Sequence, residues 1–381
     1  MTIQSGSLYF NMALEITFIV FLVATFIQIT FHLLSLIKLI RQKSKNLLKE
    51  VDDKPASVIV CAHNELNNLK NLIPKLLGQI HANYEVVVVD DRSTDGSYEY
   101  LLKEKETHDR LNLVRIDWTP EHVDAKKYAL TLGIKSAQNE IMVMTDADCD
   151  PVSSNWLKQM TSQFNEDTDF MLGFSYYKKL PGFLNLFIRY ETLQTAILYF
   201  TMALLGMPYM GVGRNIGYKR SFFLSKKGFN KFLNVTGGDD DLFVNKHSSA
   251  KNTIVVLHPE SVVLSAPKET FRDYISQKIR HISVSKLYRF KHKLMIGIFS
   301  FSKILFWILG LSLIVHSYNI LWIAGLFSIQ LLLLLWVYNR FTKILKVKYE
   351  LYSLWLMEFV YISYLVIFSL RAFTAKKIKW N

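Results

Sequence analysis

Residues 86–97 read VVVVDDRSTDGS, four valines followed directly by two aspartates and a run of small polar residues. A short run of β-branched residues predicts a strand that is buried on both faces, as in a parallel sheet. Three further strand-like runs, SVIVCA, NLVRI and EIMVMTD, occupy residues 57–62, 112–116 and 140–146. Helix-like stretches separate them, near residues 66–80, 96–106 and 126–137. This alternation predicts an α/β domain in which helices cover both faces of a parallel sheet.

Polar residues gather where the predicted strands end. HNE (63–65) follows the first strand, Asp90 and Asp91 close the second, and DADCDP (146–151) closes the fourth. Ligands of parallel sheets bind beyond the carboxyl ends of the strands. Asp90 and Asp91 could therefore accept hydrogen bonds from a base or a ribose. The alternative is that DDRSTDGS is only a turn that caps the next helix.

Long uncharged segments flank this region. The segment Ile16–Ile37 carries no formally charged side chain and is long enough to cross a bilayer as a helix. Ile304–Asn339 is also free of Lys, Arg, Asp and Glu, and HSYN (316–319) divides it into a predicted helical hairpin. Leu351–Leu370 is interrupted only by Glu358. The sequence thus predicts one amino-terminal and three carboxy-terminal membrane segments. We expect Lys303 and Glu358, the charges within apolar segments, to pair with each other.

The distribution of basic residues predicts an orientation. They follow the first segment, precede the second and follow the third, at Lys38, Arg41, Lys43, Lys45, Arg289, Lys291, Lys293, Arg340, Lys343, Lys346 and Lys348. Because Lys and Arg favour cytoplasmic loops, residues from about 50 to 290 should face the cytoplasm of a multi-pass protein of the cell membrane. Four crossings would place the basic tail, with Arg371, Lys376, Lys377 and Lys379, on the other side. That conflict disappears if the last segment is re-entrant or lies in the interface.

The composition narrows the class of protein. The 381-residue chain is 50% hydrophobic and has a formal net charge of +13. Much of that charge lies beside the predicted spans, where anionic lipid headgroups attract it, so we expect membrane lipids and not nucleic acid as partners. The two cysteines, Cys61 and Cys149, are expected to be small core residues in a reducing compartment. The stretch 183–210 is apolar but contains Arg189 and Glu191, which favours helices packed near the interface over a span.

Seven motifs occur in order along the chain: AHNE (62–65), VVVDDRSTDGS (87–97), AKKYAL (125–130), DADCD (146–150), GVGRNIGYKR (211–220), GGDDD (237–241) and QKIRH (277–281). Together they resemble the family 2 glycosyltransferases, over roughly residues 55–290. The resemblance implies the GT-A fold, a Rossmann-like fold that binds nucleotide-diphospho-sugars, and inverting transfer. The expected organisation is an amino-terminal membrane helix and basic linker (1–45), a GT-A domain (50–290) and a carboxy-terminal membrane region (294–381).

The resemblance also implies a donor site. A nucleotide-sugar, expected to be UDP-linked, would contact Ala62, Asn64, Glu65, Asp90, Asp91, Lys126 and Asp146. The DAD motif would hold a divalent cation, Mg²⁺ or Mn²⁺, with Asp148 as the direct ligand and Asp146 near the metal or ribose. Such a cation neutralises the charge that grows on a departing diphosphate. The alternatives are that DAD is an Asp-rich turn capping the helix after Pro151, that Lys126 is a solvated helix residue, and that the later GGDDD (237–241) is a solvated acidic loop.

The later motifs are expected to carry catalysis. Inversion needs a base on the far side of the sugar, and GGDDD matches the family's acidic pair, with Asp240 as the base and Asp239 beside it. Gln277 and Arg280 would approach the diphosphate, unless this stretch is only a basic amphipathic helix on the membrane. Arg214, Asn215 and His281 would lie on the acceptor side. His281 stands where the family usually has Trp, which puts processive polymer synthesis in doubt.

The leading interpretation is a membrane-anchored, inverting hexosyltransferase that acts on a lipid-linked saccharide, a lipid or a polysaccharide. Association with other proteins of cell-envelope biosynthesis is also expected. The alternatives are a processive polysaccharide synthase, a nucleotidyltransferase, or a non-catalytic nucleotide-binding membrane scaffold. AHNELNN after the first strand lacks the glycine-rich basic loop that nucleotidyl transfer usually needs. Transporters are often built from internally repeated halves, and no such repeat is visible in this sequence.

Overall fold

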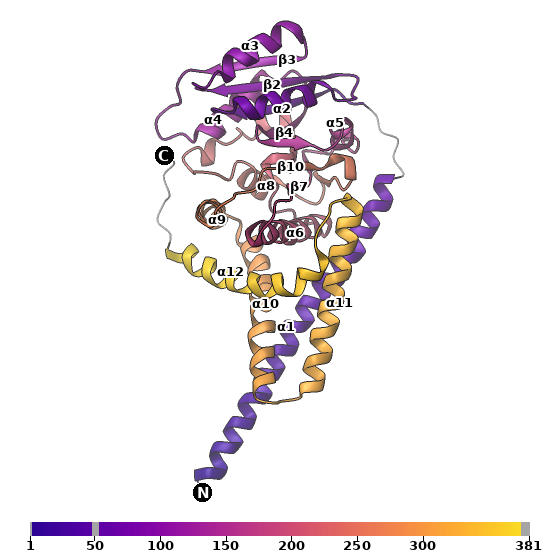
Figure 1. Ribbon diagram of the computed structural model, residues 1–381, viewed down its shortest axis with the longest axis vertical. Helices are drawn as coiled ribbons and strands as arrows, with labels where there is room; N and C mark the ends of the chain where they lie inside the picture. The colour runs from indigo at the N-terminus through magenta and orange to yellow at the C-terminus, as the bar shows by residue number, and fades with distance from the viewer. Residues whose placement is uncertain (1, 48–52, 375–381) are drawn as a thin grey trace.

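The computed structural model describes residues 2–47 and 53–374, and side chains over 9–42 and 53–368. Residues 48–52, which contain the predicted start of the α/β domain at residue 50, and the tail lysines 376, 377 and 379 lie outside this description. The chain forms an α/β domain that stands on a group of long helices (Figure 1).

A mixed sheet of seven strands, in the order β3-β2-β1-β4-β8-β6-β9, organises the α/β domain. Its parallel half comprises β1 (Ala56–Ala62), β2 (Tyr84–Asp91), β3 (Leu111–Ile116) and β4 (Ile141–Asp146). The remaining strands are β6 (Phe170–Leu172), β8 (Ile216–Lys219) and β9 (Thr253–Val255), with β8 antiparallel to both β4 and β6. A second sheet joins β5 (Cys149–Pro151), β10 (Val263–Ser265) and β7 (Ser175–Tyr177). The predicted strands and the α/β class are confirmed.

Helices on both faces explain why the strands are apolar throughout. Val86 and Val88 pack in one core with α2 (Leu66–Leu77), α3 (Ser97–Thr107) and α5 (Trp156–Thr161). Val87 points to the opposite face, into the core that contains α4 (Ala125–Ser136). Because successive side chains of a strand point to opposite faces, both valine sets are buried. Because β1, β2, β3 and β4 are parallel, their carboxyl ends meet at one edge of the sheet, as the sequence predicted.

The later helices lie beneath the sheet or lead away from it. Those of the α/β domain are α6 (Phe183–Leu204), α7 (Arg220–Ser225), α8 (Asp241–His247) and α9 (Phe271–Ser285), with short 3₁₀ turns at Gly213–Asn215, Asn230–Phe232 and Pro259–Ser261. α6 is mostly buried and is not among the described helices long and apolar enough to span a membrane. It accounts for the apolar stretch near 183–210, as expected.

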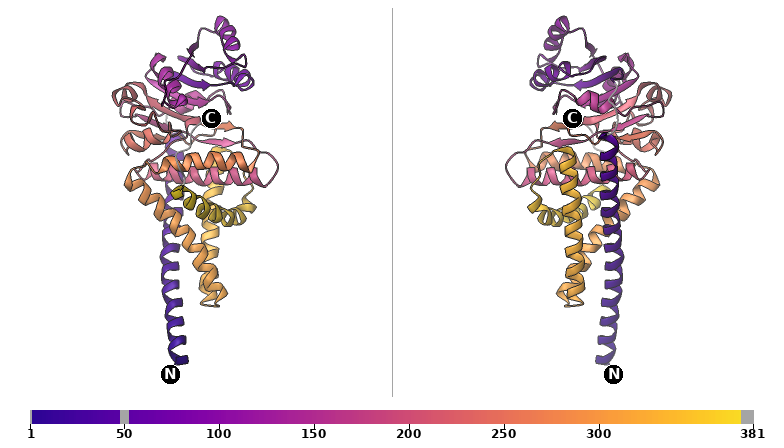
Figure 2. Two further views of the ribbon diagram at one scale, coloured as in Figure 1. Left: turned by 90° about the vertical axis from the view of Figure 1, so that its left-hand side faces the viewer. Right: turned by 90° about the vertical axis from the view of Figure 1, so that its right-hand side faces the viewer.

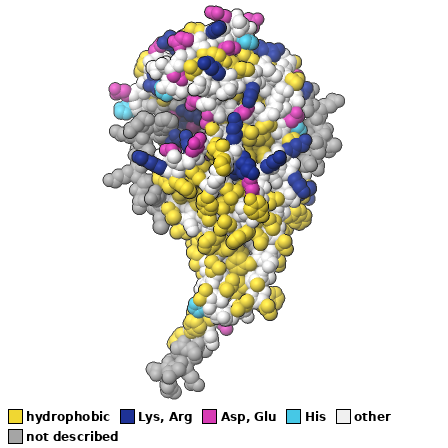
Figure 3. Space-filling view, viewed as in Figure 1, with side chains coloured by type: hydrophobic (Ala, Val, Ile, Leu, Met, Phe, Trp, Pro, Cys, Tyr) yellow, Lys and Arg dark blue, Asp and Glu magenta, His cyan; other side chains and the backbone are white. Residues whose placement is uncertain are grey.

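Within the described residues, four helices are long and apolar enough to cross a membrane: α1 (Thr2–Leu47), α10 (Phe290–Val315), α11 (Ile320–Leu345) and α12 (Leu354–Thr374), which follows a 3₁₀ turn at Leu351–Ser353. α1, α10 and α11 run lengthwise together, with the predicted hairpin turn between α10 and α11 (Figures 1 and 2). α12 instead lies across the end of these helices that is nearest the sheet (Figures 1 and 2). The surface over the long helices is largely hydrophobic, and charged side chains gather above it (Figure 3).

Candidate active site

A cleft of about 620 Å³ lies between the sheet edge and the helices below it. The DAD motif, Lys126 and the loop 210–214 form part of its wall, with the acidic turn 236–241. Residues of α6 and α9 form the remainder. Of the predicted site residues, the structure brings together around this cleft Lys126, Asp146, Asp148, Arg214, Asp239, Asp240, Gln277, Arg280 and His281.

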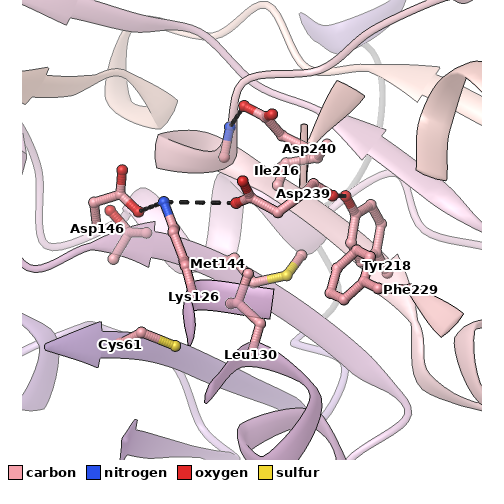
Figure 4. A pocket seen from close by; sticks show the side chains of 12 residues that line it. Cys61, Lys126, Leu130, Met144, Asp146, Ile216, Tyr218, Phe229, Asp239 and Asp240 are labelled. Carbon is pink, nitrogen blue, oxygen red and sulfur yellow. Dashed lines mark hydrogen bonds and ion pairs between the residues drawn. The ribbon is translucent and has the colours of Figure 1, made fainter. Parts of the chain in front are cut away.

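Lys126 connects the two acidic motifs of the cleft. It lies in the first turn of α4, and its Nζ is 2.8 Å from Asp146 Oδ1 and 3.5 Å from Asp239 Oδ2. Figure 4 shows the amine between the two carboxylates. Burial acts against the charge of Lys126, but Asp146 and Asp239 outweigh it and raise its pKa well above the ordinary value. Lys126 therefore stays charged and draws together motifs that lie far apart in sequence.

The acidic turn holds its two neighbouring aspartates differently. Asp240 turns away from Lys126 (Figure 4) and accepts hydrogen bonds from the amides of Gly213, at 2.7 Å, and Asp241, at 2.9 Å. Burial and the charge of Asp239 raise the pKa of Asp240 to about 6. Burial acts in the same direction on Asp239, yet Lys126 and Lys127 hold the pKa of Asp239 below its ordinary value. One carboxylate thus remains ionised while the other can exchange a proton near neutral pH.

The backbone of the acidic turn needs glycine. Gly237 and Gly238 have φ angles of 76° and 73°, which residues with side chains rarely adopt. A Cβ on Gly238 would lie 2.5 Å from Cγ1 of Val284 in α9, so the helix packs directly on the turn. Buried Lys127 secures the same turn by donating to the carbonyl oxygens of Val235 and Gly237.

The loops after β1 and β2 interlock beside the cleft but do not line it in the described structure. Asn64 Oδ1 accepts from the Thr94 amide at 2.8 Å, and the Asn64 amide donates to Ser93 Oγ at 3.0 Å. Ala62 pairs with Asp90 in the sheet, while half-buried Glu65 precedes α2 and accepts from Asn68. Of the predicted donor contacts, Ala62, Asn64, Glu65, Asp90 and Asp91 thus form a separate group at the sheet edge.

Asp90 and Asp91 differ within this group. Arg92 donates to both carboxylate oxygens of Asp91, at 2.7 and 3.1 Å, so Asp91 is already engaged. Asp90 is 1% exposed, and its Oδ1 has no hydrogen-bond partner among the described residues. Burial raises the pKa of Asp90. A buried carboxylate oxygen without a partner is costly, so Asp90 is the better candidate for accepting a hydrogen bond from a ligand.

The DAD motif supplies two carboxylates for a cation. Asp146 ends β4 and Asp148, which is exposed, follows two residues later. No group of three or more His, Cys, Asp or Glu side chains that could hold a metal ion occurs in the described part of the chain. Two carboxylates still suit Mg²⁺ or Mn²⁺, because such ions commonly keep water and bind substrate phosphates as their other ligands. Asp150 is occupied elsewhere, by Lys75 at 2.5 Å and Lys178 at 3.1 Å.

α9 brings Gln277, Arg280 and His281 to the side of the cleft opposite the sheet. Thr270 caps the helix by accepting a hydrogen bond from the Asp273 amide at 3.2 Å. Lys278 of α9 is 2.5 Å from Glu191 of α6, and both side chains are nearly buried. This pair joins the two helices of the cleft.

Arg214 and its neighbour Asn215 have different roles. Arg214 lines the cleft with its guanidinium 4.3 Å from the centre of the Tyr177 ring. Asn215 is fully buried, donates to the carbonyl oxygens of Phe174 and Ser261, and accepts from Trp156 Nε1. The expectation that Asn215 contacts the acceptor does not fit this geometry, because its amide is used up within the core.

Sequence reasoning missed Tyr177 and Glu191, which line the cleft, and Lys127, which holds the acidic turn beside it. Lys127 follows the predicted Lys126, and nothing in AKKYAL reveals that its amine turns inward. Tyr177 lies in a strand of three residues with no motif. Glu191 did carry a signal, because a charge within an apolar stretch needs a partner.

The candidate site thus combines carboxylates at the ends of parallel strands, a second acidic turn on the same cleft, and a helix that carries Arg280 on the side opposite the sheet. Residues 57–223 match the family model described as glycosyl transferase family 2. The resemblance to family 2 is thus supported over this region, and the α/β domain has the GT-A fold, as the motifs predicted.

Known proteins are similar to parts of this chain. An uncharacterized glycosyltransferase of Rickettsia bellii is 27% identical over 138 residues, which are 36% of this chain and 19% of the relative. Glycosyltransferase GlyG of Streptococcus pneumoniae is 30% identical over 122 residues, 32% of this chain and 38% of that protein. The chain thus spans well under half the length of these relatives.

One solved structure shares the overall fold. It is the mannosyltransferase PcManGT of Pyrobaculum calidifontis in complex with GDP-Man and Mn²⁺, with a TM-score of 0.54 and 18% sequence identity. The similarity covers 92% of this chain and 98% of that one, so the match extends to the long helices.

Proposed function

We propose that the protein is a membrane-anchored, inverting hexosyltransferase that moves a sugar from a nucleotide-sugar, UDP-linked in our proposal, to a lipid-linked saccharide or lipid. The observation that carries the proposal is the single cleft in which Lys126 links Asp146 of the metal motif to Asp239 of the acidic turn. Inverting transfer needs a site for the leaving group and a base on opposite sides of one sugar. In our proposal the DAD motif serves the leaving diphosphate, and the acidic turn on the same cleft provides the base.

The donor side would use the sheet edge. Asp90, with its unpartnered oxygen, would accept a hydrogen bond from the base or ribose. Asp148 and Asp146 would hold a divalent cation, which when bound neutralises the charge of the leaving diphosphate. Arg280 and Gln277 of α9 would close on the diphosphate from the other side, where a guanidinium can bind phosphate oxygens in pairs.

Asp240 is our candidate for the base. It lies in the cleft, and its two backbone hydrogen bonds fix the carboxylate in one orientation. A pKa of about 6 suits proton transfer near neutral pH. Asp239, which is adjacent to Asp240, would hold Lys126 in place, and Lys126 in turn contacts Asp146 of the metal motif. Asp239 is the alternative base, because it faces Lys126 and the metal motif directly.

The acceptor would enter beside α6 and α9, which form the part of the cleft nearest the long helices. His281 of α9 and Arg214 of the loop 210–214 both line the cleft, which supports an acceptor contact. The proximity of the cleft to apolar helices supports an acceptor that is itself in the membrane. The excess of Lys and Arg on one side of the spans supports a cytoplasmic catalytic domain in the cell membrane.

The test is product formation by the full-length protein in membranes supplied with UDP-, GDP- and dTDP-sugars, followed by mass spectrometry of the lipid extract. We expect one nucleotide class to give a glycosylated lipid, and Asp148→Ala and Asp240→Asn to abolish it. Asp109→Asn, which removes an exposed carboxylate from the α3–β3 loop, is the matched control and should retain full turnover. Unchanged turnover in both cleft variants would overturn the assignment.

A further inference from the structure

α12 differs from the other long helices in its direction. α1, α10 and α11 extend away from the sheet, whereas α12 crosses them in every view (Figures 1 and 2). By length and composition alone it too could span a membrane. Direction relative to the catalytic domain is therefore the feature that distinguishes it.

Contacts with α6 fix this direction over most of the helix. Just before α12, Glu350 pairs with Arg189 at 2.8 Å. Further along, Glu358 accepts a hydrogen bond from Tyr190, and the Tyr364 ring lies 5.7 Å from Phe187. From residue 350 to 364 a helix would advance about 21 Å, yet the chain remains beside one turn of α6. A segment that stays against the catalytic domain for this distance is not leaving it.

The opposite face of α12 is apolar and exposed. Tyr352, Trp355, Leu356, Phe359 and Ile367 are between 39% and 79% exposed. They recur at helical spacing and carry no charge. The one charged residue of the helix up to Leu370, Glu358, points inward and is 5% exposed. Aromatic and aliphatic side chains on one face suit the boundary between headgroups and acyl chains.

Lys303 explains how this inward charge is tolerated. Its amine in α10 is 2.7 Å and 2.9 Å from the two oxygens of Glu358, and both residues are buried. The pair predicted from sequence is thus confirmed, and it ties α12 to a helix of the lengthwise group. The segment beyond Tyr364, Leu365–Thr374, would span only about 15 Å, half of a hydrocarbon layer.

We propose that α12 docks on the bilayer as an in-plane interfacial helix, with lipid as the occupant of its exposed face, so that the chain crosses the membrane three times. This rests on the membrane placement proposed above. Three crossings return the chain to the catalytic side, and the basic residues at 371, 376, 377 and 379 then follow the same Lys and Arg bias as the other loops. The topological conflict in the sequence is thereby removed.

Nitroxide depth measurements test the proposal in the reconstituted full-length chain. Trp355→Cys, Phe359→Cys and Ile367→Cys would be labelled singly in a chain whose Cys61 and Cys149 are replaced by alanine. We expect all three labels at a similar shallow depth, within a few ångströms for a helix that lies in the plane. A spanning helix would place residues 355 and 367 about 18 Å apart in depth, and that result would overturn the proposal.

Reporter fusions provide an independent measurement in cells. We expect a carboxy-terminal green fluorescent protein to fluoresce and a carboxy-terminal alkaline phosphatase to be inactive, with phosphatase inserted in the 316–319 turn active. An active carboxy-terminal phosphatase together with an active turn fusion would contradict the in-plane helix. An inactive turn fusion would instead overturn the cytoplasmic orientation of the catalytic domain, and the depth data would still decide the placement of α12.

Discussion

Asp239 and Asp240 are adjacent, yet their surroundings separate their proton equilibria. The pKa of Asp240 is raised to about 6 by burial and by the charge of Asp239, whereas Lys126 and Lys127 keep Asp239 ionised. If Asp240 is the base, it must be deprotonated to act. We therefore expect kcat/KM to fall as the pH falls through about 6 and to be level above it.

The variant Asp239→Asn distinguishes the two candidates through the same pH profile. Removing the negative charge of Asp239 removes one cause of the raised pKa, so the acid limb should move to lower pH while activity remains measurable. If Asp239 were the base, the variant would lose turnover by about 10²–10⁴-fold at every pH. The profile of kcat/KM from pH 4.5 to 8 is the measurement.

Gly238 allows a prediction about stability. Its positive φ, and the short distance that an added Cβ would have to Val284, should each destabilise Gly238→Ala, by about 1–3 kcal/mol together. Adding Val284→Ala should recover only the steric part. Gly297→Ala, where no atom lies within 4 Å of the new Cβ, is the control and should leave the melting temperature unchanged or slightly higher. An equal melting temperature for Gly238→Ala and Gly297→Ala would contradict this account.

At the scale of elements, the parallel strands could be predicted from local sequence. Both of their faces are buried, so each strand is an unbroken run of apolar residues. The acidic turn and the strand-end aspartates were likewise visible as motifs. Two features were not. Arg214 and Asn215 are neighbours in one motif, and only the hydrogen bonds of Asn215 with Trp156, Phe174 and Ser261 separate a core residue from a cleft residue. The direction of α12 has no local signature either, because it is set by the distant Arg189, Tyr190 and Phe187.

Consecutive residues of α6 connect α12 with the cleft. Tyr190 donates to Glu358 of α12, while the neighbouring Glu191 lines the cleft where we propose that the acceptor enters. We expect Tyr190→Phe to raise the KM for the acceptor about fivefold, roughly 1 kcal/mol, with a smaller change in the KM for the donor, because α6 forms part of the proposed acceptor entrance. Tyr84→Phe removes a buried tyrosine hydroxyl bound to Leu77 at 2.6 Å and should change neither value. Equal changes in both KM values would indicate general loosening instead.

At the scale of the whole molecule, the Lys303–Glu358 pair joins α10 to α12, and Tyr190 of α6 in the α/β domain donates to the same carboxylate. Removing one partner leaves a buried charge without a counter-ion, which typically costs about 3–5 kcal/mol, whereas removing both leaves none. We therefore expect Lys303→Met and Glu358→Gln each to lower the melting temperature in detergent strongly. The double variant should be more stable than either single variant, despite carrying both changes. If the two losses simply added, the residues would act independently, and α10 and α12 would not be joined through this ion pair.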